Sequence, residues 1–252
     1  MHEFLRENKT MNTIGISTNC AMHLPLERVL DILEPITGLV EIQCDAYHSL
    51  FRHAAVLEKF DLRYTIHAPT SDGNIAEPFE PIRRASIEVL KETAEIADST
   101  GAEKLVIHPG FCLDPTVWND SISALHRSIQ ELGALQGKFS VRFVMENLGS
   151  LECCHFQSTE LVQELRASGL GLTLDVGHAN LTGTLDAFLQ EKPDHLHLHD
   201  NKGIDDEHAA CGTGTVDFSK ILGATEDATL ILEVLRLEDV KPSLEYLASL
   251  GY

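Results

Sequence analysis

Eight short apolar segments, each followed by a stretch compatible with a helix, limit the fold of this 252-residue chain more than any other feature. Strands that alternate with helical segments are typical of βα units and a parallel sheet. Eight such units in about 250 residues match the size of a closed (β/α)8 TIM barrel. The chain shows no linker or abrupt change of composition, so we predict a single domain over residues 1–252. The predicted strands are Thr13–Ser17, Leu39–Gln43, Arg63–His67, Lys104–His108, Val141–Glu146, Gly171–Asp175, His195–His199 and Thr229–Glu233.

Apolar stripes predict the helices. The clearest helix is predicted over Pro81–Thr100, because apolar residues recur there at helical spacing and proline suits a first turn. Ser121–Leu135 and Ser158–Leu165 show similar patterns. Met11 directly precedes the first strand, and residues 1–10 contain nothing that a barrel needs, so we expect a dispensable tail there.

The charge balance disfavours nucleic acid as a partner. Thirty-nine acidic and 19 basic side chains give a formal net charge of −20, which repels a polyphosphate. No run of Lys and Arg could follow a DNA backbone. We therefore expect a small-molecule substrate.

Three features predict a cytoplasmic protein without membrane association. No apolar run is long enough to span a bilayer, and residues 1–13 lack the apolar core of a signal peptide. The six cysteines form neither a CxxC pair nor a disulfide-rich spacing, as expected of free thiols. The sequence carries no indication of an oligomeric state.

Side chains that can bind metal ions end most of the predicted strands. In a TIM barrel these ends converge at the active-site mouth, where buried carboxylates are costly without partners or cations. A lone histidine there is more often a hydrogen-bonded core residue, and Asp175 could simply cap a helix. Several such groups together instead predict a metal site. The strand-end residues are His67, His108, Glu146, Asp175 and Glu233, and the segment HLHLH adds His195, His197 and His199 on one face.

Two short motifs extend this set. In LDVGH, Asp175 and His178 lie three residues apart, and in DEH, Asp206 and His208 lie two apart, where an extended chain would let both bind one ion. Histidine mixed with carboxylate favours Zn²⁺ or Mn²⁺ over Mg²⁺ or Ca²⁺. The turn Gly212-Thr213-Gly214 could let backbone approach a substrate or could only form a turn.

In this order, these residues resemble the xylose isomerase-like barrel superfamily, which includes the endonuclease IV family and a group of sugar phosphate isomerases and epimerases. The resemblance covers nearly the whole chain. It is carried by IHAPTSDGNIA, KLVIHPG, FVMENLG, LTLDVGHAN, LHLHDNK, DDEHAACGTG and LILEV.

The endonuclease IV branch implies three ions held by nine ligands. The isomerase and epimerase branches imply one ion, with Glu146 and Glu233 as catalytic groups. His178 and His199 are then expected to contact the substrate. The implied three-ion ligand sets are His67, His108 and Glu146; Glu146, Asp175, His197 and Glu233; and His178, Asp206 and His208.

Three enzymatic interpretations follow, and together they imply one to three Zn²⁺ or Mn²⁺ ions per chain. Hydrolysis of a phosphoester in a small sugar-phosphate-type substrate is favoured, because it gives a task to all nine side chains. The alternative is a one-metal isomerase or epimerase of a sugar or sugar phosphate. An abasic-site DNA endonuclease is a lesser alternative, since the chain reads LDVGH and HLHDNK where the nucleases read close to LDTCH and HLNDSK. A non-enzymatic metal-bound binding module is the remaining interpretation.

Overall fold

Eight parallel strands close into a barrel in the order β1 to β8, as predicted from the sequence. The computed structural model describes residues 14–71, 73–149, 151–222, 225 and 227–252. Each strand pairs with its neighbours in the chain, and β1 closes the barrel against β8. The strands are β1 (Gly15–Ser17), β2 (Leu39–Gln43), β3 (Arg63–His67), β4 (Lys104–Ile107), β5 (Arg142–Glu146), β6 (Gly171–Asp175), β7 (His195–Leu198) and β8 (Thr229–Leu232).

The strand ends differ slightly from the prediction. His108, His199 and Glu233 lie one residue beyond β4, β7 and β8, because the chain leaves the pairing there to enter the following loop. Val141 precedes β5 rather than beginning it. The predicted strand start at Thr13 and the predicted dispensable tail, residues 1–10, lie outside the described residues.

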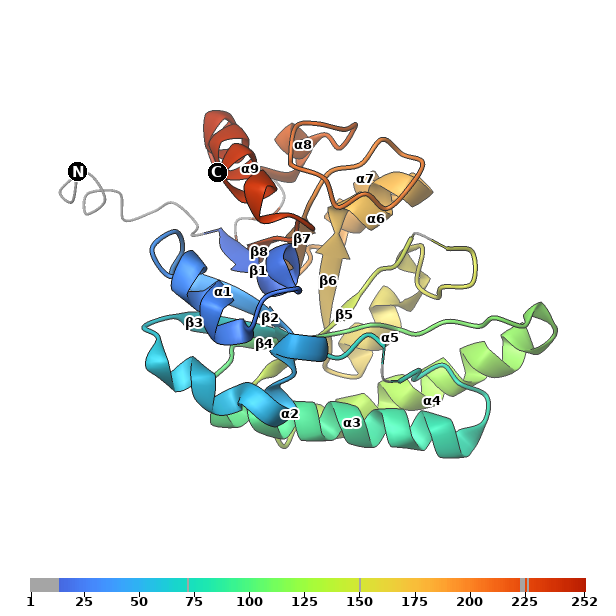
Figure 1. Ribbon diagram of the computed structural model, residues 1–252. Helices are drawn as coiled ribbons and strands as arrows, with labels where there is room; N and C mark the ends of the chain where they lie inside the picture. The colour runs from blue at the N-terminus through green and yellow to red at the C-terminus, as the bar shows by residue number, and fades with distance from the viewer. Residues whose placement is uncertain (1–13, 72, 150, 223–224, 226) are drawn as a thin grey trace.

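Helices surround the barrel (Figure 1). The helix predicted over Pro81–Thr100 is α3, and the one predicted over Ser121–Leu135 is α4; both begin earlier, and the two lie side by side. The predicted Ser158–Leu165 helix is instead a 3-10 turn, Thr159–Leu161, followed by α5. The helices are α1 (Leu26–Leu33), α2 (Leu50–His53), α3 (Glu80–Ser99), α4 (Trp118–Gln136), α5 (Val162–Ala167), α6 (Val176–Thr182), α7 (Leu185–Gln190), α8 (Phe218–Leu222) and α9 (Leu237–Leu250).

The barrel interior is unusually polar below its mouth. Glu41 of β2 reaches His195 of β7, and because these strands are not neighbours, the contact crosses the interior. Thr65 of β3 also bonds to Glu41. All three side chains are completely buried. The apolar core therefore lies chiefly between the strands and the helices, while the interior supports a polar site at the strand ends.

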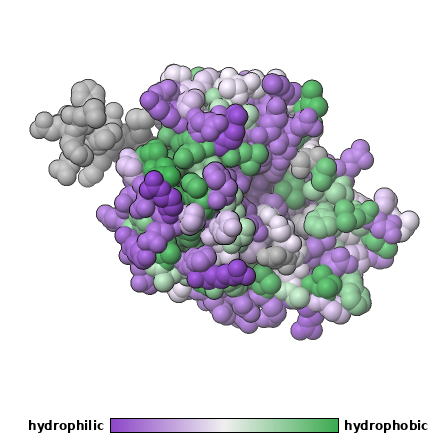
Figure 2. All heavy atoms as spheres, in the orientation of Figure 1, coloured by the Kyte–Doolittle hydropathy of each residue, from purple (hydrophilic) through white to green (hydrophobic). Residues whose placement is uncertain are grey.

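Among the described residues, no helix combines the length and apolar character needed to cross a membrane. On the face shown in Figure 2, hydrophilic and hydrophobic side chains are interspersed.

Candidate metal centre

The nine side chains predicted as metal ligands converge near the strand ends in three groups, two of which share a residue. Within each group, one potential ligand atom per residue lies within 4.8 Å of every other. Glu146 belongs to two of the groups and so joins them. The groups are His67, His108 and Glu146; Glu146, Asp175, His197 and Glu233; and His178, Asp206 and His208.

Glu146, which ends β5, forms the centre of the cluster. Its Oε2 lies 3.1 Å from His67 Nε2 and 3.3 Å from His108 Nε2. Its Oε1 lies 3.4 Å from His197 Nδ1, which in turn lies 3.2 Å from Glu233 Oε2. Glu146 is 1% exposed, so its charge is nearly isolated from solvent and depends on these neighbours.

The third group joins α6 to the loop after β7. Asp206 Oδ2 lies 3.0 Å from His178 Nε2 and 3.4 Å from His208 Nε2. The extended chain that we predicted for DEH is wrong, because His208 adopts a left-handed conformation with φ of 42°. This local turn still directs both side chains to one point, and it is a conformation that non-glycine residues seldom adopt.

Most of these separations suit ligands of one ion better than direct hydrogen bonds. Ligands about 2.0–2.2 Å from a tetrahedral Zn²⁺ lie about 3.3–3.6 Å from one another. The contacts of His108, His197 and His208 with carboxylates, at 3.2–3.4 Å, fall near this range. The groups therefore have the spacing that a shared cation requires.

In three of the candidate histidine ligands, a backbone carbonyl binds the ring nitrogen that does not face the cluster. A carbonyl oxygen only accepts hydrogen bonds, so each Nδ1 must carry the proton, and the Nε2 lone pair faces the cluster. This is the arrangement usual for metal-bound histidines. The pairs are His67 to Ala68, His178 to Asn147 and His208 to Glu233, at 2.9, 3.0 and 3.0 Å.

Among the nine candidate ligands in the described residues, three buried atoms lack a hydrogen-bond partner, namely His197 Nδ1, His197 Nε2 and Asp206 Oδ1. Buried polar atoms are normally satisfied, so each such atom needs an explanation. A cation bound between Glu146 and Glu233 would satisfy His197 Nδ1. The donor set of imidazole and carboxylate therefore fits a divalent ion such as Zn²⁺ or Mn²⁺.

Electrostatics indicate that the cluster attracts positive charge. Burial lowers the pKa of His67 and of His208, but hydrogen bonds to Glu146 and Asp206 and the charge of Glu233 outweigh burial and raise both pKa values to about 9. Burial likewise raises the pKa of Glu146, yet the surrounding histidines hold it well below the usual value. Protons or metal ions can supply the missing charge, and the two compete for the same nitrogens.

His199 is less suited to substrate contact than we predicted. Its ring is completely buried, and Nε2 lies 2.9 and 3.0 Å from the two oxygens of Asp175. The ring also stacks on His208, with centroids 3.8 Å apart. His199 thus contacts two candidate ligands, Asp175 and His208, and its contact with a substrate stays a prediction. Asp175 also accepts the backbone N–H of His178 at 2.7 Å, so it caps α6 as well as joining the cluster.

Sequence reasoning missed two supporting residues. Glu41 lies in the middle of β2 and contacts His195 and His197; its place among apolar neighbours in LVEIQ was a usable indication. Asn147 directly follows Glu146 and binds the backbone of Asp175 through both ends of its amide, at 2.8 and 3.1 Å. It therefore couples the ends of β5 and β6.

The Gly212-Thr213-Gly214 turn forms the binding surface for a buried aspartate rather than for a substrate. The carboxylate of Asp200 accepts the backbone N–H groups of Gly212 and Gly214 at 3.0 and 2.8 Å, and also those of Asn201 and Val216. A Cβ on Gly214 would lie 2.1 Å from the Asn201 carbonyl oxygen. These bonds fix both ends of the loop that carries Asp206 and His208.

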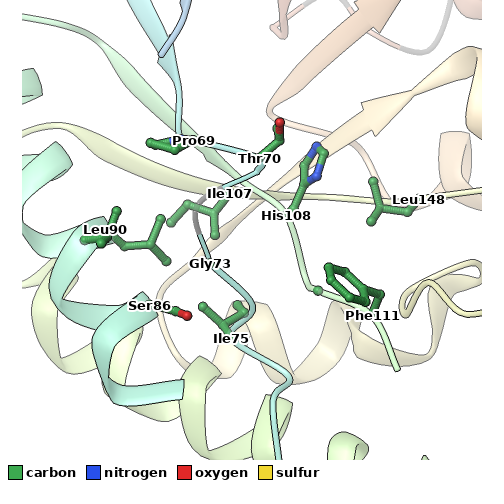
Figure 3. A pocket seen from close by; sticks show the side chains of 12 residues that line it. Pro69, Thr70, Gly73, Ile75, Ser86, Leu90, Ile107, His108, Phe111 and Leu148 are labelled. Carbon is green, nitrogen blue, oxygen red and sulfur yellow. The ribbon is translucent and has the colours of Figure 1, made fainter. Parts of the chain in front are cut away.

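A small cavity of about 50 Å³ lies beside His108, between the loop after β3, α3 and the end of β4 (Figure 3). Ser86 and Leu90 of α3 form one side, and Phe111 and Leu148 lie near the imidazole. This volume suits a few water molecules rather than a sugar ring.

Known proteins share this architecture. Residues 42–250 match the family model described as xylose isomerase-like TIM barrel. An uncharacterized protein of Methanocaldococcus jannaschii is 31% identical over 214 residues, covering 82% of this chain and 84% of that protein. A probable endonuclease 4 of Mycobacterium leprae is 24% identical over 190 residues, covering 69% of this chain and 73% of that protein.

Solved structures give the same fold. A D-tagatose 3-epimerase-like protein superposes with a TM-score of 0.84 at 24% identity, covering 94% of this chain and 96% of that one. IOLI protein with a binding zinc atom gives 0.76 at 18% identity, covering 95% of each chain. D-allulose 3-epimerase from Methylomonas sp. gives 0.72 at 15% identity, covering 95% of this chain and 90% of that one.

Proposed function

Because the chain belongs to the xylose isomerase-like TIM barrel family, we propose that it is a divalent-metal-dependent enzyme that isomerises or epimerises a small sugar or sugar phosphate. The descriptions of its structural neighbours as sugar epimerases support this reaction over the phosphoester hydrolysis that the sequence favoured. We propose Zn²⁺ or Mn²⁺ as the ion, which agrees with the donor set and with the zinc reported for one neighbour.

The observation that carries the proposal is the buried quartet Glu146, Asp175, His197 and Glu233. These residues lie in β5, β6 and β7 and directly after β8, and none is more than 4% exposed. Three carboxylates and one imidazole at these separations form a site for one ion. Only the side facing the barrel mouth is left for a substrate.

The two glutamates would do the proton chemistry. Glu146 and Glu233 approach His197 Nδ1 from different strands, at 3.4 and 3.2 Å, so one substrate carbon above the ion would have a carboxylate within reach on two sides. One can remove a proton from that carbon while the other returns one. The ion, when bound, would polarise the substrate carbonyl and the adjacent hydroxyl. We propose His178, at the rim of the cluster, as a substrate contact.

A small carbohydrate fits the charge of the protein better than a polymer does. The net charge of −20 opposes a polyanion, whereas bound cations would offset the repulsion of a single phosphate. An abasic-site nuclease is disfavoured for the same reason, although a probable endonuclease 4 is among the relatives.

Phosphoester hydrolysis is the second candidate function, and one observation favours it. The two outer groups, His67 with His108 and His178 with Asp206 and His208, have ligand-like spacing that a one-metal isomerase does not need. Two or three ions would orient a phosphate and neutralise its developing charge.

Counting metal ions and assaying two substrate panels would distinguish these functions. We expect the protein, reconstituted with Zn²⁺ or Mn²⁺ and desalted, to interconvert members of a ketose and ketose-phosphate panel and to leave a phosphomonoester panel intact. Glu233→Gln is the control for background activity. Phosphate release at two or three ions per chain, without isomerisation, would instead establish the hydrolase.

A further inference from the structure

We infer that Glu41, inside the barrel below the cluster, is a positioning residue that holds His197 with Nε2 protonated and its Nδ1 lone pair directed at the metal quartet. The inference rests on the proposed metal role of that quartet. Glu41 belongs to none of the nine predicted ligands, and it is completely buried.

Glu41 contacts three side chains inside the barrel. Its Oε2 accepts from the Thr65 hydroxyl at 2.8 Å and from His195 Nε2 at 2.9 Å. Its Oε1 lies 2.8 Å from His197 Nε2, and neither of these two atoms has a hydrogen-bond partner elsewhere among the described residues. The proton of His197 Nε2 therefore has one acceptor within reach, although the contact is not a linear hydrogen bond.

The protonation of His197 follows from what its two nitrogens face. Nε2 faces the carboxylate of Glu41, which can only accept a proton when it is ionised. Nδ1 faces Glu146 and Glu233 at 3.4 and 3.2 Å, where a lone pair can bind a cation shared with those carboxylates. A neutral imidazole with the proton on Nε2 satisfies both sides at once.

Glu41, His195 and His197 could also be taken for a fourth metal site, since their ligand atoms cluster. The separations argue against this. At 2.8 and 2.9 Å the carboxylate contacts both histidines directly, which is shorter than the roughly 3.3–3.6 Å between ligands of one tetrahedral ion. The hydroxyl of Thr65 donates a further hydrogen bond to the same carboxylate. Glu41 is therefore hydrogen-bonded to Thr65 and His195 and in direct ionic contact with His197, with no room for an ion between them.

The carboxylate of Glu41 affects how strongly His197 can bind a metal ion. Three candidate ligands, His67, His178 and His208, are oriented by backbone carbonyls. His197 alone among these four is oriented by a charged group, which makes its imidazole a stronger donor to a metal ion. Burying that carboxylate is costly, so its presence favours a specific role over packing.

The test compares Glu41→Gln with wild-type protein and with Thr173→Val as a matched control. Thr173 is also completely buried in the barrel, and its hydroxyl has no hydrogen-bond partner among the described residues. We expect Glu41→Gln to bind Zn²⁺ about 10–100-fold more weakly by competition with a chelator. Its Co²⁺-loaded form should show an altered visible spectrum, while Thr173→Val should retain both wild-type affinity and spectrum.

A second measurement does not depend on the variant folding. Nitrogen-15 NMR of histidine-labelled, Zn²⁺-loaded wild-type protein reports which nitrogen of His197 carries the proton. We expect protonated Nε2 and unprotonated Nδ1. Protonated Nδ1, or wild-type Zn²⁺ affinity in a folded Glu41→Gln, would overturn the inference and leave the proposed function intact. A wild-type protein that binds no Zn²⁺ or Mn²⁺ would overturn the proposed function and this inference together, whereas the two outcomes above overturn the inference alone.

Discussion

The ring of His199 fills the space where a side chain at position 177 would lie. A Cβ placed on Gly177 would be 2.1 Å from Cε1 of His199 and 2.6 Å from its Nδ1. Real atoms do not approach so closely, so either His199 or α6 would have to move. This relationship gives a physical reason for glycine in LDVGH, because His199 bonds to Asp175 and stacks on His208.

Gly177→Ala should therefore destabilise the protein by about 1–3 kcal/mol, the usual cost of overpacking a buried site. We also expect weaker Zn²⁺ binding, because the displaced ring no longer holds Asp175. Urea unfolding and chelator competition measure the two effects. Gly137→Ala is the control, since a Cβ there meets nothing within 4 Å. Equal stability of Gly177→Ala and wild type would show that the ring moves without cost.

Glu233→Gln should abolish turnover, whereas His208→Ala should reduce isomerisation by no more than about fivefold. Glu233 is a proposed proton-transfer group, but His208 belongs to the outer group that a one-metal reaction does not use. Steady-state kinetics and metal content of both variants provide the check. A loss of a hundredfold or more in His208→Ala, together with loss of one ion, would favour the hydrolase.

Metal binding should release protons at pH 7.5. In the metal-free protein His67 and His208 have pKa values raised to about 9, so both are protonated at this pH. When ions also fill the outer groups, each of these histidines must lose a proton to bind an ion. Affinity should therefore rise with pH until about 9. Titration calorimetry in buffers of different ionisation enthalpy measures the release, and His67→Ala should lower it by about one proton. Equal heats in all buffers would contradict this expectation.

The barrel and most of the cluster could be predicted because most of the predicted strands end in a side chain that can bind a metal ion. His67, Glu146 and Asp175 end predicted strands that the structure contains with the same last residue. The family resemblance is also confirmed, by the match over residues 42–250. Alternation of strands and helices in the sequence was enough to bring these side chains to one end of the barrel.

The supporting contacts could not be predicted in the same way. Glu41 meets His195 and His197 across the barrel interior, more than 150 residues later in the chain, so local periodicity contains no trace of the contact. The left-handed conformation of His208 depends on a loop fixed by Asp200. Such features arise from closure of the barrel, which a pattern along one strand does not specify.

Duplex DNA should bind weakly at physiological salt. Lys and Arg normally neutralise the phosphates, and this chain carries 19 of them against 39 acidic residues. Two or three bound dications offset only part of the net charge of −20. A gel-shift titration with intact and abasic duplexes, using metal-loaded protein, tests this. Submicromolar binding of the abasic duplex would restore the DNA-repair interpretation.

Acid should destabilise the metal-free protein partly through His48, which belongs to none of the candidate metal groups of the described residues. His48 is completely buried, and burial lowers its pKa below the ordinary value of 6.5, although the Leu24 carbonyl, 3.0 Å from Nε2, acts in the opposite direction. The unfolded chain therefore takes up a proton at higher pH than the folded one. The stability contributed by neutral His48 is present above pH 6.5 and is lost as the pH falls towards the folded-state pKa.

His48→Gln keeps a donor for the Leu24 carbonyl but does not titrate, so it isolates this effect. Between pH 7 and 5, the wild-type free energy of unfolding should fall more steeply than that of the variant, by up to about 1.4 kcal/mol per pH unit for one proton. Urea unfolding in the presence of a chelator measures both slopes without a contribution from metal release. Parallel slopes for the two proteins would show that His48 titrates alike in the folded and unfolded states.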